Sequence, residues 1–270
     1  MQLLDVTRER TEHAEQAAHR GVGRRGARRS GAPRRWSRAG TVATLLAACV
    51  IALACASCGG HAQTRVLFIG NSFTFKNGGI DAELARLEPS CATSSVTAGG
   101  ATLQQQWTTG QALQAIRSGH WDYVVLQEQS QTPVIAQALF RDYAARFAQA
   151  IRASGATTVL LMTWQRPDSA AEGVTTANLA ASYRSVADQI GARVAPAGEA
   201  FAEALLERPD LVLNQPDGHP TTAGTYLAAC VVYDTIFRRS PVGIASSDLG
   251  ISPDARVFLQ EVAAESLTGS

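Results

Sequence analysis

The chain has 270 residues, of which 46% are hydrophobic and 17% are charged, enough for one sizeable hydrophobic core. Its formal net charge is +1, but residues 1–40 hold ten arginines against four acidic residues, which leaves 14 basic and 19 acidic residues in the remainder. The part expected to fold is therefore mildly acidic and has no basic stripe to follow a phosphate backbone, which argues against a nucleic-acid partner.

The first 60 residues have the composition of an export signal. An arginine- and glycine-rich run at 21–38 precedes an apolar run at 42–56, which ends in small residues. We therefore expect residues 1–60 to be a leader and residues 61–270 to form one exported domain, which is periplasmic, extracellular or lipid-anchored at the cell envelope. Two alternatives stay open: Cys58 could carry a lipid after cleavage, or the apolar run, which is short for a bilayer, could remain as an uncleaved anchor.

From residue 65 onward, short apolar runs alternate with amphipathic stretches. The sequence predicts strands at 66–69, 95–97, 123–126, 158–163 and 192–195. Between them it predicts helices at 81–87, 103–117, 136–153 and 175–190. Short apolar strands that alternate with amphipathic helices indicate an α/β fold, in which helices cover both faces of a parallel sheet.

Ser72 lies two residues beyond the first predicted strand, after Gly70, which permits a tight turn. In an open parallel sheet, ligands bind beyond the carboxyl ends of the strands. A nucleophile at this position would be exposed yet rigidly held. The alternative is that Ser72 only caps the helix that follows, as serine often does.

His219 is the best candidate for a catalytic base. The other histidines lie in or just after the leader or, for His120, at the amino end of a strand, where we expect a structural role. His219 precedes a helix-like segment that Pro220 is expected to begin. Asp217 could orient the histidine ring and stabilise its charged form. Together with Ser72, these residues form a plausible Ser/His/Asp set in which the histidine deprotonates the serine.

An acyl-transfer site also needs hydrogen-bond donors for the oxygen that becomes negatively charged. Residues 98–102 follow the second predicted strand, and their glycines would let a backbone N–H approach a substrate. Residues 127–131 follow the third strand and offer glutamine amides. The strand-end features therefore converge on one edge of the predicted sheet.

This ordered set resembles the SGNH (GDSL-like) hydrolase superfamily over residues 65–237. Residues 69–73 resemble its first block, which carries the nucleophile. Residues 100–102 resemble its second block, whose glycine donates a backbone N–H, and residues 217–220 resemble its last block, which carries the acid and base. The runs DYVVLQEQSQTP and HPTTAGTYLAACVVY also resemble a poorly characterised secreted bacterial branch of the superfamily. The resemblance implies a three-layer α/β/α sandwich of flavodoxin-like type with a parallel five-stranded sheet. It also implies ester hydrolysis without a metal or other cofactor, often on acetylated sugars.

Two features depart from the superfamily pattern. The resemblance assigns the oxyanion donors to the backbone N–H groups of Ser72 and Gly100 and to a third amide, usually an asparagine, for which this chain offers Gln129 or, as an alternative, Gln127. The last block usually has two residues between aspartate and histidine, whereas only Gly218 separates them here. This spacing could misplace the carboxylate and leave a Ser–His dyad or an inactive site.

We therefore predict an exported serine esterase that acts on a small-molecule or carbohydrate ester and has no cofactor. Contact with a membrane is expected only through a lipid on Cys58 or an uncleaved leader. The alternative is a catalytically silent carbohydrate-binding or envelope protein on the same scaffold. Trp107, Trp164 and Tyr226 could line a sugar-binding cleft in either case.

Two cysteines, Cys91 and Cys230, remain in the expected domain and lack metal-ligand spacing. In an exported protein they could form a disulfide. The place of Cys230 within an apolar helix face favours an ordinary buried thiol.

Overall fold

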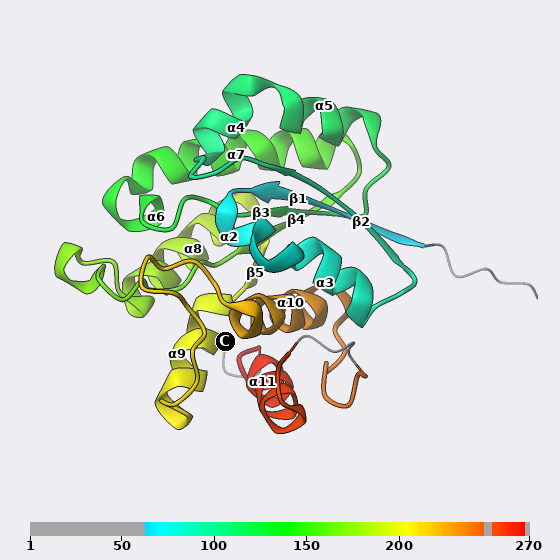
Figure 1. Ribbon diagram of the computed structural model, residues 1–270. Helices are drawn as coiled ribbons and strands as arrows, with labels where there is room; N and C mark the ends of the chain where they lie inside the picture. The colour runs from blue at the N-terminus through cyan, green and yellow to red at the C-terminus, as the bar shows by residue number, and fades with distance from the viewer. Residues whose placement is uncertain (1–62, 246–249, 268–270) are drawn as a thin grey trace, which may run out of the picture. The chain divides into compact units, whose positions relative to one another are not determined.

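The computed structural model describes residues 63–245 and 250–267, so the predicted leader lies outside the described residues (Figure 1). Five strands form one sheet in the order β2-β1-β3-β4-β5, and every neighbouring pair is parallel. The strands are β1 (Thr64–Gly70), β2 (Cys91–Thr97), β3 (Tyr123–Leu126), β4 (Thr157–Leu161) and β5 (Arg193–Ala195). The predicted parallel five-stranded sheet is confirmed.

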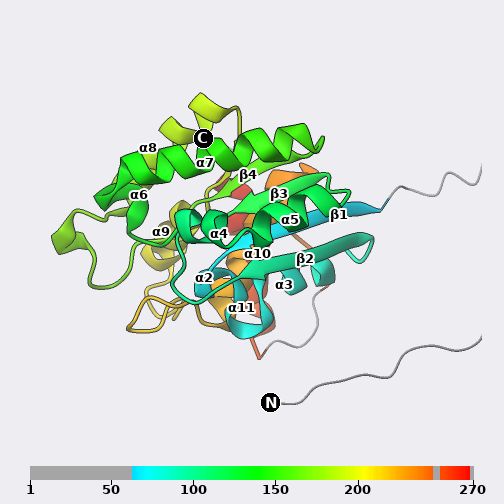
Figure 2. The same cartoon turned by 90° about the horizontal axis from the view of Figure 1, so that it is seen from above.

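Helices cover both faces of this sheet (Figures 1 and 2). One layer contains α3 (Ile80–Leu87), α9 (Ala197–Glu207), α10 (Thr222–Phe237) and α11 (Pro253–Glu265). The other layer contains α4 (Leu103–Thr109), α5 (Gln111–Ser118), α7 (Gln137–Ala153) and α8 (Thr176–Ile190). The loops between elements hold the short helices α2 (Ser72–Phe75) and α6 (Thr132–Ile135) and the 3₁₀ turns η1 (Lys76–Gly78) and η2 (Ala170–Glu172). The arrangement is the three-layer α/β/α sandwich that the sequence predicted.

Strand β1 is buried against both helical layers. Val66 and Phe68 pack with α10, while Leu67 and Ile69 pack on the opposite side with α7, and none of the four is exposed. This alternation follows from the period of two along a strand. An unbroken apolar run is what a central parallel strand requires, and it brings the chain to the carboxyl edge of the sheet at Gly70.

Two helix boundaries differ from the sequence prediction. The helix predicted at 103–117 is two helices, α4 and α5, because Gly110 adopts a left-handed conformation between them. Pro220 was expected to begin α10, and this was wrong: the side chain of Thr221 caps the helix, and Pro220 pairs with Asn214 in an isolated antiparallel bridge. The segment before α10 is therefore a structured loop.

The two cysteines of the described chain are both buried and free, so they form no disulfide, and Cys230 is the buried thiol that its position favoured. No helix within residues 63–245 and 250–267 combines the length and the apolar character that crossing a bilayer requires.

Candidate active site

The structure brings Ser72, His219 and Asp217 together in one chain of hydrogen bonds. The Oγ atom of Ser72 lies 2.8 Å from Nε2 of His219. On the other side of the ring, Nδ1 of His219 lies 2.8 Å from Oδ2 of Asp217. With the proton on Nδ1, the ring donates to the carboxylate and accepts from the serine hydroxyl. This is the arrangement that proton transfer from a serine nucleophile requires.

Gly218 makes the short spacing between aspartate and histidine workable. Its φ is +86°, a conformation that glycine adopts without steric cost. As a result, Oδ1 of Asp217 accepts from the backbone N–H of His219 at 3.1 Å while Oδ2 contacts the ring. The hydrogen bond from the ring and then that from the backbone lower the pKa of Asp217 below its usual value, so the carboxylate is ionised at neutral pH. The reduced spacing therefore leaves Asp217 in contact with the ring.

Asn71, and not Ser72, caps the helix that follows β1. The side-chain oxygen of Asn71 accepts from the N–H of Phe73 at 3.0 Å. Its amide nitrogen donates to the carbonyl of Ala101 at 3.0 Å, which ties the end of β1 to the loop after β2. Because Asn71 performs the capping, the Ser72 hydroxyl is available to His219.

Gln127 supports the turn that carries the nucleophile. Its side-chain oxygen accepts from the Asn71 N–H at 2.8 Å and from the Thr74 hydroxyl at 2.9 Å, and its amide nitrogen donates to the Glu128 carbonyl. A Cβ on Gly70 would lie 2.6 Å from both Gln127 Oε1 and Thr74 Oγ1. Only glycine fits at residue 70, and the amide of Gln127 is fully engaged inside the protein.

Trp164 holds the loop that carries the catalytic-base candidate. The indole N–H of Trp164 donates to the carbonyl of Gly218 at 3.0 Å. The indole stacks between Phe73 and Phe201, with centroid separations of 4.8 and 4.2 Å, and Phe73 also contacts the ring of His219 at 5.6 Å. Since Trp164 is only 1% exposed, it is mainly a core residue and presents little surface to a substrate.

Asn77 supports the same loop from the other side. Its amide nitrogen donates to the carbonyl of Pro220 at 2.8 Å and to the hydroxyl of Thr225 at 2.9 Å. Asn77 has a φ of +55°, which asparagine tolerates better than most residues. The role of Asn77 was not predicted: the Asn-Gly-Gly run after the first strand indicates a turn but gives no sign of a partner more than 140 positions away.

Two of the expected oxyanion donors are free. Within the described part of the chain, neither the N–H of Ser72 nor that of Gly100 has a hydrogen-bond partner. Ser72 is the first residue of α2, where an N–H has no partner inside the helix. Gly100 has a φ of +67° and is exposed, and the bond from Asn71 to Ala101 fixes its loop beside the nucleophile.

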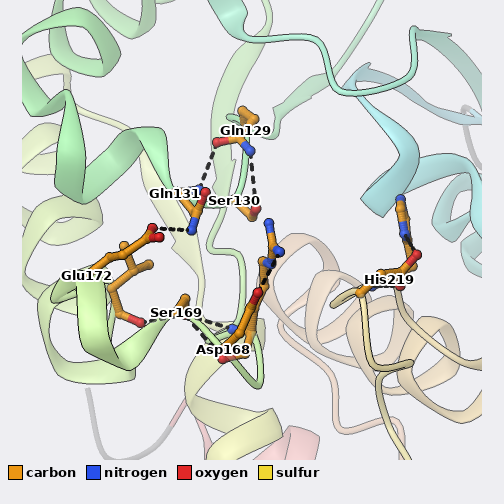
Figure 3. A network of polar contacts seen from close by, with 10 residues as sticks. Gln129, Ser130, Gln131, Asp168, Ser169, Glu172 and His219 are labelled. Atoms are coloured by element: carbon orange, nitrogen blue, oxygen red, sulfur yellow. Dashed lines mark hydrogen bonds and ion pairs between the residues drawn. The ribbon is translucent and has the colours of Figure 1, made fainter.

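The side chain of Gln129 is partly engaged. Its oxygen accepts from the N–H groups of Gln131 at 2.9 Å and Thr132 at 3.1 Å, while its nitrogen has only a 3.4 Å contact with the Ser130 hydroxyl. Figure 3 shows the contacts of Gln129 with Gln131 and Ser130, and none of its dashed lines joins Gln129 to His219. The amide nitrogen of Gln129 is therefore less firmly engaged than that of Gln127, although Gln129 does not contact the histidine.

Two hollows flank the site residues. One, of about 420 Å³, has Trp164 in its wall and is otherwise lined mainly by α9 and residues 211–214. The other, of about 320 Å³, borders the Gly100 loop and is lined by Ala98, Gly99, Ala101, Gln105, Gln106 and Thr109. Tyr226 is fully buried, so it does not line a cleft as predicted. Trp107 is partly exposed and packs edge-on against Phe147, and its place in a cleft stays a prediction. In residues 63–245 and 250–267, no group of three or more His, Cys, Asp or Glu side chains could hold a metal ion.

No family model and no curated protein matches the chain. Among solved structures, a protein of Slackia heliotrinireducens assigned to the SGNH hydrolases is 28% identical, with a TM-score of 0.56 over 64% of this chain and 98% of that one. A DUF4886 family protein from Bacteroides uniformis is 18% identical, with a TM-score of 0.61 over 76% and 95% of the two chains. A protein of Parabacteroides merdae assigned as a GDSL-like lipase is 13% identical, with a TM-score of 0.54 over 66% and 97%.

The sheet order and the helical layers are those of an α/β/α hydrolase fold of SGNH type. The predicted resemblance to the SGNH (GDSL-like) hydrolase superfamily is confirmed by the Slackia protein, and the other two structures share the fold.

Proposed function

We propose that this protein is an exported serine esterase in which Ser72 is the nucleophile, His219 the general base and Asp217 the residue that orients the histidine. The observation that carries the proposal is the unbroken chain of two 2.8 Å contacts from Ser72 Oγ through the ring to the Asp217 carboxylate. A hydroxyl is a weak nucleophile unless an adjacent base removes its proton. The geometry supplies that base.

In the first half of the reaction, Ser72 Oγ attacks the ester carbonyl carbon and its proton passes to Nε2 of His219. Asp217 stabilises the resulting imidazolium and keeps the ring in place. The tetrahedral intermediate then collapses: the bond to the alcohol oxygen breaks, His219 gives its proton to that oxygen, and an acyl group remains on Ser72. A water molecule, deprotonated by His219, hydrolyses the acyl-serine in the second half.

The N–H groups of Ser72 and Gly100 and the amide of Gln129 are the proposed donors to the tetrahedral oxyanion. The free state of the two backbone groups supports this assignment. Donors held in place before the reaction stabilise the charge without reorganising, which is a large part of catalysis in acyl transfer. Gln127 is the weaker candidate because both ends of its amide are engaged.

The proposed substrate is an ester or acetyl group on a carbohydrate. The carbohydrate part of this proposal rests on the resemblance of the sequence. The hollow beside Gly100 offers room for a substrate, and its lining combines the apolar residues Ala98 and Ala101 with the polar residues Gln105, Gln106 and Thr109. The buried state of Trp164 and Tyr226 weakens the aromatic argument for a sugar cleft and leaves Trp107 as the one partly exposed member of the three. Comparing turnover of acetylated xylan with that of p-nitrophenyl acetate tests the substrate class.

Export is proposed from the composition of residues 1–60 alone. N-terminal sequencing of protein from its native host should find a mature start between about residues 56 and 65, outside the cytoplasm. An intact leader on cytosolic protein would contradict this part of the proposal.

The catalytic proposal is tested by steady-state kinetics of four variants. We expect Ser72→Ala and His219→Ala each to lower kcat by about 10⁴-fold or more, the double variant to be little worse, and Asp217→Ala to lose less. Ser94→Ala and His120→Ala are matched controls, because both residues are exposed and lie away from the carboxyl edge of the sheet. Undiminished ester hydrolysis by Ser72→Ala would overturn the mechanism, and a parent inert to esters would favour the silent carbohydrate-binding alternative.

A further inference from the structure

Glu128 is a buried acid between the two segments that carry proposed oxyanion donors. It lies two residues beyond the end of β3 and its side chain has no exposed surface. Its Oε1 accepts from the N–H of Gln129 at 2.7 Å. The N–H of Leu103 lies 3.2 Å from Oε1 and 3.3 Å from Oε2. Leu103 is the first residue of α4 and comes immediately after residues 98–102, here named the oxyanion loop. One carboxyl group therefore links the oxyanion loop to the turn after β3.

An acid at this buried position costs free energy when it is ionised. No basic side chain in the described part of the chain forms an ion pair with Glu128, and an unpaired buried charge is costly. Burial raises the pKa of Glu128 to about 7, against the opposing effect of the two N–H groups. The titratable group that faces it from a neighbouring element is Tyr183 of α8, and burial raises the pKa of Tyr183 far enough to keep it neutral. Glu128 therefore changes its charge near neutral pH without a partner that compensates.

A carboxylate is nevertheless well suited to this position. When ionised it offers only acceptors, so it can bind both N–H groups without presenting a donor to either. A glutamine of the same shape would point its NH₂ group at one of them. A protonated carboxyl group would likewise direct an O–H into the pair.

We propose that ionised Glu128 is a positioning residue, which holds the oxyanion loop and the turn after β3 at the separation that lets Gly100 and Gln129 donate to the same substrate oxygen. The inference rests on the proposed esterase function and adds a second ionisation to it. Full turnover then requires an ionised Glu128 as well as the Ser72–His219 pair. Protonation of Glu128 releases one of the two segments and weakens the stabilisation of the oxyanion.

Kinetics of Glu128→Gln from pH 5 to 9 test the catalytic part. We expect the kcat/KM of the parent to exceed that of Glu128→Gln by about 10- to 100-fold at pH 9, and this ratio to approach 1 towards pH 5 as Glu128 in the parent becomes protonated. The difference at high pH should lie in kcat, with KM changed much less, because one misplaced donor costs less than its full removal. Glu83→Gln is the matched control, since Glu83 is also buried but lies on α3 and pairs with Arg86; its ratio to the parent should not depend on pH. A ratio for Glu128→Gln that is independent of pH would overturn the proposal while leaving the esterase itself in place.

Hydrogen–deuterium exchange tests the link without relying on activity. The amides of Leu103 and Gln129 should be protected in the parent and should exchange at least about 10-fold faster in Glu128→Gln, while Glu83→Gln leaves them unchanged. Equal protection in the parent and Glu128→Gln would overturn the positioning role. If the parent is inert to esters and to fluorophosphonate, the esterase proposal fails and the catalytic part of this inference fails with it, whereas the exchange result still decides whether Glu128 joins the two segments.

Discussion

Gly218→Ala tests whether the short Asp-Gly-His spacing depends on glycine. An alanine at the φ of +86° found here costs about 1–2 kcal/mol in backbone strain. Its Cβ would also lie 2.5 Å from Cγ of Arg166, and overpacking of this kind costs about 1–3 kcal/mol. The free energy of unfolding should therefore fall by about 2–5 kcal/mol. At roughly 2–4 °C per kcal/mol for a domain of this size, the Tm should drop by about 4–20 °C.

Gly218→Ala should lower kcat only by displacing Asp217, so its loss of kcat should not exceed that of Asp217→Ala. The kcat of Gly218→Ala should lie between those of the parent and Asp217→Ala, measured with p-nitrophenyl acetate below the Tm of the variant. Adding Arg166→Ala removes the clash but not the backbone strain, so the double variant should stay about 1–2 kcal/mol less stable than Arg166→Ala alone. A Gly218→Ala protein with the parent's Tm and kcat would refute the argument that a positive φ creates the Asp217–His219 contact.

Three further predictions concern the carboxyl edge of the sheet. Gln129→Glu keeps the oxygen that accepts from the turn but removes the amide donor, so kcat should fall by about 10²–10³-fold with a smaller change in Tm. A larger loss of kcat in Gln127→Ala, at an equal folded fraction, would show that Gln129 is wrongly assigned as the donor. Gly70→Ala should lower the free energy of unfolding in urea by about 2–4 kcal/mol, because its Cβ would displace the buried Gln127 amide; a change below about 0.5 kcal/mol would contradict this. Because the folded pKa of Glu128 is about 7 and its ordinary value is 4.5, its neutral form stabilises the fold below pH 4.5 and this contribution is lost as the pH rises to 7. Relative to Glu128→Gln, the parent should therefore lose about 3 kcal/mol of unfolding free energy over that range, and parallel stability curves would refute the shifted pKa.

The fold was predictable where one local pattern decides the structure. The run Val66 to Ile69 is apolar without interruption, which fits a strand buried on both faces, and the turn at Gly70 then fixes the place of Ser72. The prediction of one helix at 103–117 was wrong because Gly110 adopts a left-handed conformation that ends α4. The apolar pattern of a sequence does not show whether a glycine adopts this conformation. Pro220 was misplaced because the side chain of Thr221, the next residue, caps the helix, so Thr222 and not Pro220 is the first helical residue.

The site was predictable as a set of residue types but not as a set of contacts. Ser72, Asp217 and His219 could be paired because strand-end positions converge on one edge of a parallel sheet. The partners of Trp164 and Asn77 lie more than 50 and 140 positions away and depend on how the loops pack, so no local signal identified them. Glu128 was overlooked for the same reason: its role depends on the hydrogen bond from the Leu103 N–H, which forms only in the folded chain.

The most direct test of the central claim is covalent labelling of the purified parent protein with a fluorophosphonate probe, followed by mass mapping of the labelled peptide. Phosphonylation requires a serine activated by its base, so it reports the Ser72–His219 pair without assuming any substrate. We predict a single label on Ser72, lost in Ser72→Ala and strongly slowed in His219→Ala, while His120→Ala labels like the parent. A parent protein that takes up no label, or a label on any serine other than Ser72, would contradict the account.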